Sequence, residues 1–254
     1  MKIEELKKRK EELGYTNEMV SKLSGVPLGT VQKFFGGSTS KPRYNTLQSI
    51  ECVLFPELHS KKEAALSKEG EFTIEDWKNL PDGAWMEFID GVLYDRNYPT
   101  KRHQFVATQL TILLGIAIKE KGGPCLVLGP AGVQPDENDD KNGFIPDVLI
   151  VCDREKYTKD EETIVGAPDF VAEVLSPSTE KYDRTKKLNK YWQKGVREYW
   201  IIDIKNEEVI VYRFEKAVPP VVYGFEEQVP LGISEGDIII DFKSISEGLK
   251  RYFG

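Results

Sequence analysis

One acidic residue inside an apolar run constrains the fold of this chain most strongly. Residues 170–175, FVAEVL, form an almost continuous apolar stretch that is typical of a β-strand buried on both faces. Glu173 lies in the middle of this stretch. Because an ionised carboxylate is costly to bury alone, Glu173 is expected either to be neutral or to contact a cation. The sequence therefore predicts a central buried strand whose acid has a partner.

A second apolar strand is expected to begin at Asp147. The connection at residues 154–168 is long enough to let the two strands lie side by side as an antiparallel pair. Side chains alternate between the faces of a strand, so Asp147 shares a face with Leu149, and Glu173 shares one with Val171. If the register aligns the two acids, their repulsion raises one pKa, and a divalent cation between them would remove the conflict.

The remaining pattern of residues 72–254 predicts an α/β domain around a mixed sheet. Two apolar runs flank Asp90 and Gly91, which is a strong signal for a β-hairpin. Helices are expected at residues 101–121 and 179–194 because apolar residues recur there at helical spacing. Further strands are expected in the segments CLVLG, VQP, EYWIIDI, EVIVYRF, VVYGF and DIIIDF.

Cysteine and histidine usage limits the chemistry that the chain can support. Cys52, Cys125 and Cys152 are widely separated, which predicts reduced thiols rather than a disulfide framework. His59 and His103 are the two histidines of the sequence, so a histidine-rich metal site is excluded. Any metal would be held by carboxylates, which favours a hard ion such as Mg²⁺ or Mn²⁺.

The 254-residue sequence carries a net charge of −7 and is typical of a globular protein. No apolar stretch approaches the roughly 20 residues that span a bilayer, and the first residues lack the apolar segment of a signal peptide. We therefore expect a cytoplasmic protein that does not bind membranes.

The first 58 residues predict a small all-α domain. The expected helices cover residues 3–13, 18–24, 28–35 and 44–54. Thr16 or Asn17 can cap the second helix, and Gly25 ends it. Two helices joined by a short turn that contains glycine are typical of a helix-turn-helix. Residues 59–71 are polar and charged, so we expect a linker there before the second domain at 72–254.

The segment TNEMVSKLSGVPLGTVQKFFGG resembles the Cro and lambda-repressor type of DNA-binding domain. In that family the third helix enters the major groove. The resemblance implies core positions at Met19, Val20, Leu23, Val26, Val31 and Leu47. It also implies that Thr30, Gln32 and Lys33 face the DNA. Lys41 and Arg43 would be available for phosphates. A helical bundle that serves protein contact or dimerisation is the alternative.

The second domain resembles the PD-(D/E)XK nuclease superfamily and, more closely, the Uma-type family of restriction-endonuclease-like proteins. The resemblance rests on the segments MEFIDGVLYD, RHQFVATQL, the Pro146-Asp147 pair, EVLSPST and YDRTKKLNKYWQKGVREYWIID. It implies a restriction-endonuclease-like mixed sheet with flanking helices.

The same resemblance implies roles for individual residues. Asp147 and Glu173 would bind Mg²⁺ or Mn²⁺, and Glu87 in the first hairpin would complete the acidic cluster. The superfamily carries a lysine two residues after the glutamate, where this chain has Leu175. In the closer family the lysine comes from the following helix, which implies Lys187. Lys186 and Lys190 compete with Lys187 for this role. A histidine at the start of the long helix, His103, is also expected near the site.

These features predict a Mg²⁺-dependent endonuclease that hydrolyses DNA phosphodiester bonds and is targeted to duplex DNA by the N-terminal helices. Asp147, Glu173, Lys187 and Glu87 are the predicted catalytic residues, and a homodimer is expected. The alternative is a DNA-binding transcriptional regulator whose nuclease-like domain is inert and serves dimerisation. A third possibility is a protein-interaction module that does not bind DNA.

Overall fold

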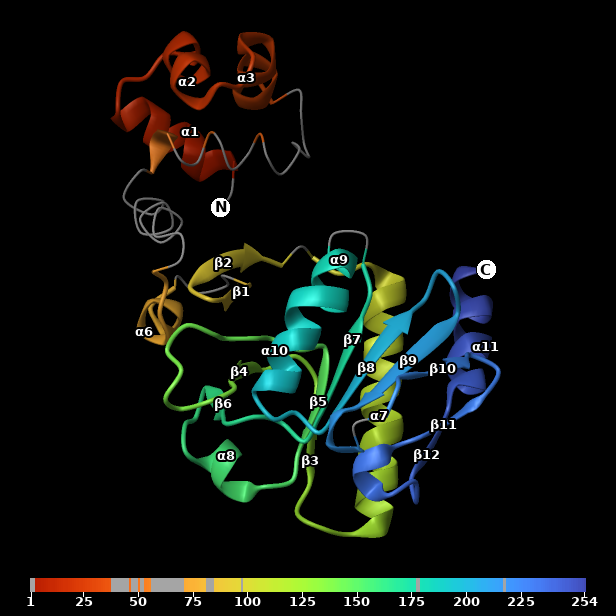
Figure 1. Ribbon diagram of the computed structural model, residues 1–254. Coiled ribbons are helices and arrows are strands. Elements are labelled where there is room, and N and C mark those ends of the chain that lie inside the picture. Colours follow the sequence, from red (N-terminus) through yellow and green to blue (C-terminus); the bar gives the residue numbers. More distant parts are fainter. Residues whose placement is uncertain are drawn as a thin grey trace. The chain divides into compact units, whose positions relative to one another are not determined.

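A computed structural model places most of the chain, and its described residues form two compact units (Figure 1). One unit contains the described residues up to Phe55 together with Leu80, and the other contains residues 71–79 and the described residues from Trp85 onwards. The structure describes residues 3–37, 46, 50, 53–55, 71–80, 85–96, 98–176, 179–216 and 218–254. Outside these residues lie Lys41, Arg43, Leu47, Cys52, His59 and nearly all of the predicted linker.

Three helices of the N-terminal unit lie close to where the sequence predicts them: α1 (Ile3–Glu12), α2 (Asn17–Ser24) and α3 (Leu28–Phe35). The side chain of Thr16 accepts a hydrogen bond from the backbone N–H of Met19 at 3.2 Å and so caps α2. Gly25 ends α2 in the left-handed region, at a φ of 68°, where glycine carries no steric cost.

The core of this unit differs from the prediction on one helix. Val20, Val26 and Val31 are buried as expected, together with Phe34. Met19 and Leu23 are exposed, by 44% and 57%, so their assignment to the core is wrong. These two residues stand four apart and share one stripe of α2. The helix packs through the neighbouring stripe, which contains Val20.

The second unit is built on a six-stranded mixed sheet with the strand order β10-β9-β8-β7-β5-β3. Neighbouring strands are antiparallel except for β7 and β8, which are parallel. The strands are β3 (Leu126–Leu128), β5 (Val148–Val151), β7 (Phe170–Val174), β8 (Glu198–Asp203), β9 (Glu208–Arg213) and β10 (Val221–Gly224). The predicted antiparallel pairing of β5 with β7 is confirmed.

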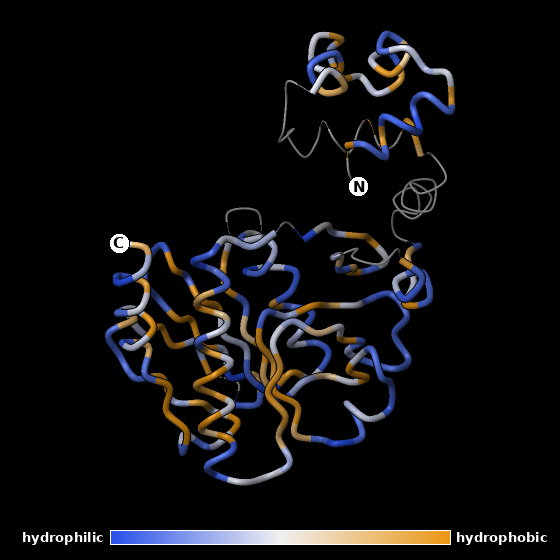
Figure 2. Tube along the Cα trace, turned by 180° about the vertical axis from the view of Figure 1, so that it is seen from behind, coloured by the Kyte–Doolittle hydropathy of each residue, from blue (hydrophilic) through white to orange (hydrophobic). Residues whose placement is uncertain are grey.

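Different helices cover the two faces of this sheet. The helices α7 (Lys101–Lys121) and α11 (Phe242–Phe253) pack on one face, where Leu110 and Leu114 meet Ala172 and Trp200 in the larger core. The other face is covered by α9 (Glu180–Tyr182), the π-helical turn η1 (Asp183–Lys187) and α10 (Leu188–Gln193). Figure 2 shows the central strands as a continuous hydrophobic zone between these layers.

Smaller elements surround the sheet. The predicted hairpin is confirmed as β1 (Met86–Ile89) and β2 (Val92–Asp95), with left-handed φ values of 52° and 72° at Asp90 and Gly91. The remaining elements are α6 (Ile74–Lys78), α8 (Arg154–Thr158), β4 (Gly132–Gln134) paired with β6 (Thr163–Val165), β11 (Gln228–Pro230) paired with β12 (Ile239–Asp241), and the 3₁₀ turns η2 (Phe214–Lys216) and η3 (Gly232–Ser234). No helix in the described part of the chain is long and apolar enough to cross a bilayer.

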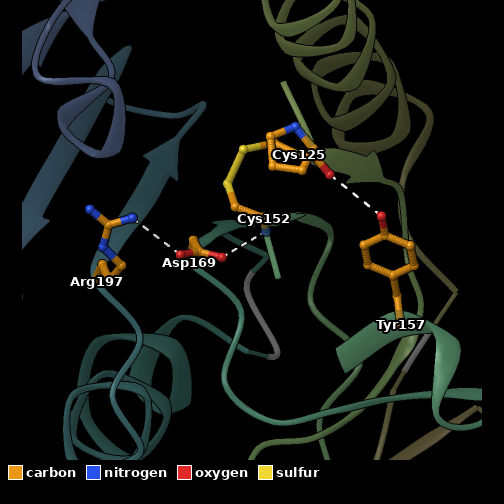
Figure 3. Close-up of a disulfide and its surroundings, with 6 residues drawn as sticks. Cys125, Cys152, Tyr157, Asp169 and Arg197 are labelled. Carbon is orange, nitrogen blue, oxygen red and sulfur yellow. Dashed lines mark hydrogen bonds and ion pairs between the residues drawn. A yellow bond between two sulfur atoms is a disulfide. The ribbon is translucent and has the colours of Figure 1, made fainter. Parts of the chain in front are cut away.

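A disulfide joins Cys125 to Cys152, so the prediction of reduced thiols is wrong for this pair (Figure 3). The cause is strand register: Leu126 pairs with Val151, which sets the two cysteines opposite each other at the adjacent position. Figure 3 also shows Asp169 accepting the backbone N–H of Cys152 and pairing with Arg197. The 27-residue separation between the cysteines conceals this proximity in the sequence.

Candidate active site

The two central acids stand opposite each other at one end of the sheet. Val148 pairs with Ala172, and Leu149 pairs with Val171. The next position in this antiparallel register brings Asp147 opposite Glu173. Both side chains are buried on the face covered by η1 and α10. The alternation that the sequence predicts therefore places both carboxylates on one face.

Asp147 is held by three donors that come from different elements. Its Oδ2 accepts the backbone N–H of Val174 at 2.9 Å and lies 3.1 Å from Nε2 of His103 in α7. Its Oδ1 lies 2.7 Å from Nη2 of Arg96. Burial alone would raise the pKa of Asp147, but the hydrogen bond with His103 and the charge of Arg96 outweigh it and lower the pKa to about 2. Asp147 is therefore ionised at neutral pH.

Glu173 has a different electrostatic environment. Its Oε1 accepts hydrogen bonds from Nζ of Lys187 and from the hydroxyl of Tyr191, both at 2.8 Å. Complete burial raises the pKa of Glu173 to about 8, with the neighbouring carboxylates adding to the shift and Lys187 opposing it. Asp147 and Glu173 thus differ strongly in proton affinity although they lie side by side.

Glu87 joins the cluster from the hairpin, as the resemblance implied. Its Oε1 accepts the backbone N–H of Ile145 at 2.6 Å, just before β5, and its Oε2 lies 2.9 Å from Nζ of Lys187. Only 2% of the residue is exposed. Three carboxylates that are far apart in the sequence therefore meet at one place.

Of the three candidate lysines, Lys187 is the one that reaches the acids. It lies in η1, is 1% exposed, and contacts Glu87, Glu173 and, at 3.5 Å, Asp183. Desolvation would lower its pKa, but the three carboxylates outweigh this and raise it, so the ammonium stays charged. Two other lysines point elsewhere: Lys186 donates to the Tyr94 hydroxyl at 2.7 Å, and Lys190 contacts Asp90.

Arg96 is the member of the cluster that sequence reasoning missed. Its guanidinium lies within 4.0 Å of all three carboxylates: Asp147 at 2.7 Å, Glu87 at 3.9 Å and Glu173 at 4.0 Å. Its Nη1 also donates to the carbonyl of Ile145. The available signal was hairpin register, because Glu87 pairs with Tyr94 and Arg96 stands two residues further along the same face.

The cluster carries more negative than positive charge. Four acids, Glu87, Asp147, Glu173 and Asp183, face two permanent cations, Arg96 and Lys187. With every acid ionised, the charge of these six groups is −2. Burial also raises the pKa of Asp183, as it does for Glu173. When all four acids are ionised, the site can therefore accept further positive charge.

A cleft of about 180 Å³ leads to this cluster, and its lining includes Arg96, His103, Asp147, Glu173 and Asp183. A larger cleft of about 450 Å³ beside α8 contains none of these residues. The smaller cleft is the candidate active site because the paired charges face it.

The carboxylate oxygens of the cluster are the atoms that would bind a divalent metal. Among the described residues, no three His, Cys, Asp or Glu side chains are arranged to hold an ion together. Nevertheless, Oδ1 of Asp147 and Oε2 of Glu173 both face one atom, Nη2 of Arg96. Carboxylate oxygens are the ligands that Mg²⁺ and Mn²⁺ prefer. The donor set fits a hard divalent cation, and Arg96 lies between the two carboxylates.

The predicted DNA-facing residues of the first unit that the structure describes are all exposed on α3. They are Thr30, Gln32 and Lys33. Their role in DNA contact stays a prediction.

The fold of the second unit is one already seen in a nuclease-like protein. The crystal structure of a protein from Anabaena variabilis, described as a "putative nuclease belonging to DUF820", superposes with a TM-score of 0.59 at 18% identity, covering 70% of this chain and 99% of the other. This likeness shows the fold class: a mixed α/β fold with a central mixed sheet and flanking helices. Residues 73–236 match the Uma2 family, described as "Putative restriction endonuclease", and the chain belongs to that family.

Two relatives from Synechocystis sp. are similar over part of their length. One uncharacterised protein, slr1290, is 28% identical over 127 residues, and another, sll1609, is 26% identical over 118 residues. The matches cover 50% and 46% of this chain. They span 64% and 65% of the two relatives, which is less than two thirds of their length.

Proposed function

We propose that the protein is a divalent-cation-dependent endonuclease that hydrolyses DNA phosphodiester bonds. One observation carries the proposal: Glu87, Asp147 and Glu173, from three separate segments, converge with Lys187 and Arg96 in one cluster, and Asp147, Glu173 and Arg96 line a cleft. Membership of the Uma2 family supports a nuclease, and the excess negative charge supports a cation as cofactor.

In this proposal Asp147 and Glu173 hold Mg²⁺ or Mn²⁺. When bound, the ion supplies Lewis-acid polarisation of the phosphate and acidifies a water molecule for attack. Asp147 suits the role of a permanent ligand because its pKa is held at about 2 by His103 and Arg96 against the opposing effect of burial. Glu173, with a pKa raised to about 8 by burial, holds a proton that must leave before it serves as an anionic ligand.

Lys187 is proposed to act as a positioning and charge-stabilising group. Its raised pKa means that the ammonium has no free lone pair at neutral pH, so it does not serve as a general base. Instead its Nζ donates to Glu173 and pairs with Glu87, which fixes both carboxylates. A charged ammonium beside the cleft also favours the negative charge that develops on a phosphate during hydrolysis.

The N-terminal unit is proposed to direct this activity to duplex DNA. The exposed residues Thr30, Gln32 and Lys33 on α3 are available for the major groove, and Lys41 and Arg43 are proposed for phosphates. We also propose a homodimer, because paired cleavage of the two strands suits two copies of the site.

The test is cleavage of supercoiled plasmid DNA with Mg²⁺ or Mn²⁺. Wild-type protein is expected to nick or linearise the plasmid, and Asp147→Asn and Glu173→Gln are expected to lose this activity while remaining folded. Asp169→Asn is the matched control, since Asp169 is an ion-paired acid beside Arg197 at the other end of β7. Equal nicking by all four proteins would indicate a contaminant and contradict the proposal.

A DNA-binding regulator with an inert second unit is the alternative function. The observation that favours it is the position of Arg96 and Lys187, which already neutralise part of the acidic cluster. A regulator would bind duplex DNA equally with and without Mg²⁺ and would leave it intact. Fluorescence anisotropy measures binding to duplex DNA, and a gel of the same samples shows whether the DNA has been cleaved. Together the two measurements separate the two functions.

A further inference from the structure

Arg96 pairs with all three carboxylates that are proposed for the site. Nη2 of Arg96 is 2.7 Å from Oδ1 of Asp147 and 4.0 Å from Oε2 of Glu173, and Nε is 3.9 Å from Oε2 of Glu87. One guanidinium therefore contacts the three acids assigned to the site. Lys187, by contrast, pairs with Glu87, Glu173 and Asp183.

The side chain of Arg96 is 11% exposed, so it has a route to solvent that Lys187, at 1%, lacks. It comes from the end of the hairpin and lines the cleft together with Asp147 and Glu173. Of the two cations, Arg96 is thus the one placed to leave the acids without unfolding the unit.

From this geometry we infer that Arg96 is the resident counter-cation of the site, and that a divalent cation binds by displacing its guanidinium from between Asp147 and Glu173. The inference rests on the proposed function, because it concerns the same metal site. Arg96 acts as a positioning residue that lowers the affinity for the metal, since the ion must compete with a charge already in place.

Two like charges a few ångströms apart repel even at the effective dielectric of a protein surface, so removal of the guanidinium should strengthen metal binding. In the full-length protein, Mn²⁺ affinity is measured from the electron paramagnetic resonance signal of free Mn²⁺. We expect Arg96→Met to bind Mn²⁺ on the order of tenfold more tightly than wild type. If Arg96 only supported the structure of the site, Arg96→Met would bind Mn²⁺ more weakly than wild type, because a damaged site holds its metal ligands less well in place.

Two control variants sharpen this comparison. Arg96→Lys keeps the positive charge and should bind Mn²⁺ close to the wild-type affinity. Arg197→Met removes a guanidinium that pairs with Asp169 and Glu215, which lie outside the site, and should also leave the affinity unchanged. Equal or weaker binding by Arg96→Met, with wild type binding normally, overturns the inference and leaves the proposed function standing.

Absence of Mn²⁺ binding in wild type, Arg96→Met and Arg96→Lys alike would overturn the proposed function together with this inference. Because Arg96→Met removes one partner from each of three buried carboxylates, a measurement on wild type guards against misfolding. The Nε–Hε resonance of Arg96, assigned by its loss in Arg96→Lys, is expected to shift with Mg²⁺ until the site saturates, while that of Arg197 stays fixed. An Arg96 resonance that does not move at saturating Mg²⁺ contradicts displacement.

Discussion

The two faces of the central sheet use the same strands for different purposes. On the face covered by α7 and α11, Val148 and Ile150 of β5 and Ala172 and Val174 of β7 pack into an apolar core. On the opposite face, the alternate residues Leu149, Val151 and Val171 are apolar. Asp147 and Glu173 lie on this same face, opposite each other at one end of the sheet. Pleating alone separates the two roles, so one strand can support the fold and also position a charged site.

This comparison teaches that the polar face depends on its counter-charges. Burial of an apolar side chain is favourable by itself, whereas a buried carboxylate is stable only with partners. Tyr191 illustrates the combination, because its ring packs in the core beneath the site while its hydroxyl donates to Glu173. Variants on the two faces should therefore fail in different ways.

The largest loss of stability is expected from Lys187→Met. This change leaves Glu87, Glu173 and Asp183 without the ammonium that pairs with all three, and breaking such a buried pair costs about 3–5 kcal/mol. Urea unfolding followed by circular dichroism measures it. Lys186→Met, on the exposed neighbour, is the control, and equal losses in the two variants would show that Lys187 has no special role.

A comparable but slightly smaller loss is expected on the apolar face. Leu110 lies on α7 and is buried in the apolar core. Leu110→Ala opens a cavity there and should lower the free energy of unfolding by about 3 kcal/mol. Because Leu110 packs in the apolar core, on the face of the sheet opposite Asp147 and Glu173, Mn²⁺ affinity of the folded protein should not change. A Leu110→Ala protein that keeps its stability but loses metal binding would contradict the separation of the two faces.

The polar face should also make stability depend on pH. Burial raises the pKa of Glu173 to about 8 from its ordinary value near 4.5, so the folded state binds the proton more tightly than the unfolded state. Its contribution to stability is complete below pH 4.5 and is lost as the pH rises to about 8. In metal-free buffer, stability should fall over this range by on the order of 1 kcal/mol per pH unit.

Glu173→Gln should flatten this dependence, since the amide does not titrate. Thermal unfolding of wild type and Glu173→Gln at pH 5, 6, 7 and 8 tests the sign. A wild-type protein that gains stability over this range, relative to the variant, would contradict the assigned environment of Glu173.

The smallest effect is expected in the N-terminal unit. Lys33→Ala should weaken binding to duplex DNA and reduce its salt dependence by at most about one counterion, because one positive charge proposed to face the DNA is lost. Lys22→Ala, on the exposed surface of α2, is the control. Fluorescence anisotropy at two salt concentrations measures both. Identical affinities for wild type and Lys33→Ala would remove Lys33 from the proposed DNA surface.

Sequence reasoning reached the features that depend on local pattern. The alternation of residues predicted which faces Asp147 and Glu173 occupy, and the apolar runs predicted β5, β7 and their pairing. The Asp90-Gly91 signal predicted the hairpin that delivers Glu87. Each of these conclusions needs only strand periodicity or a turn preference.

Features that depend on long-range register were missed. The hairpin register puts Arg96 on the same face as Glu87, but this face reaches the acids because Phe88 pairs with Gly143 in the segment before β5, a contact that no local pattern encodes. The pairing of Cys125 with Cys152 likewise follows from the β3–β5 register. The resemblance to the Cro and lambda-repressor type placed Met19 in the core, but apolar residues fill two stripes of this short helix, and the stripe that packs inward contains Val20.

Calorimetric titration of Mn²⁺ into wild type, Asp147→Asn and Glu173→Gln tests most directly whether the opposed acids form a cation site. The account predicts saturable binding of one ion per chain in wild type and loss of that binding in both variants, with the fold of each intact by circular dichroism. Equal heats of binding for all three proteins would contradict it.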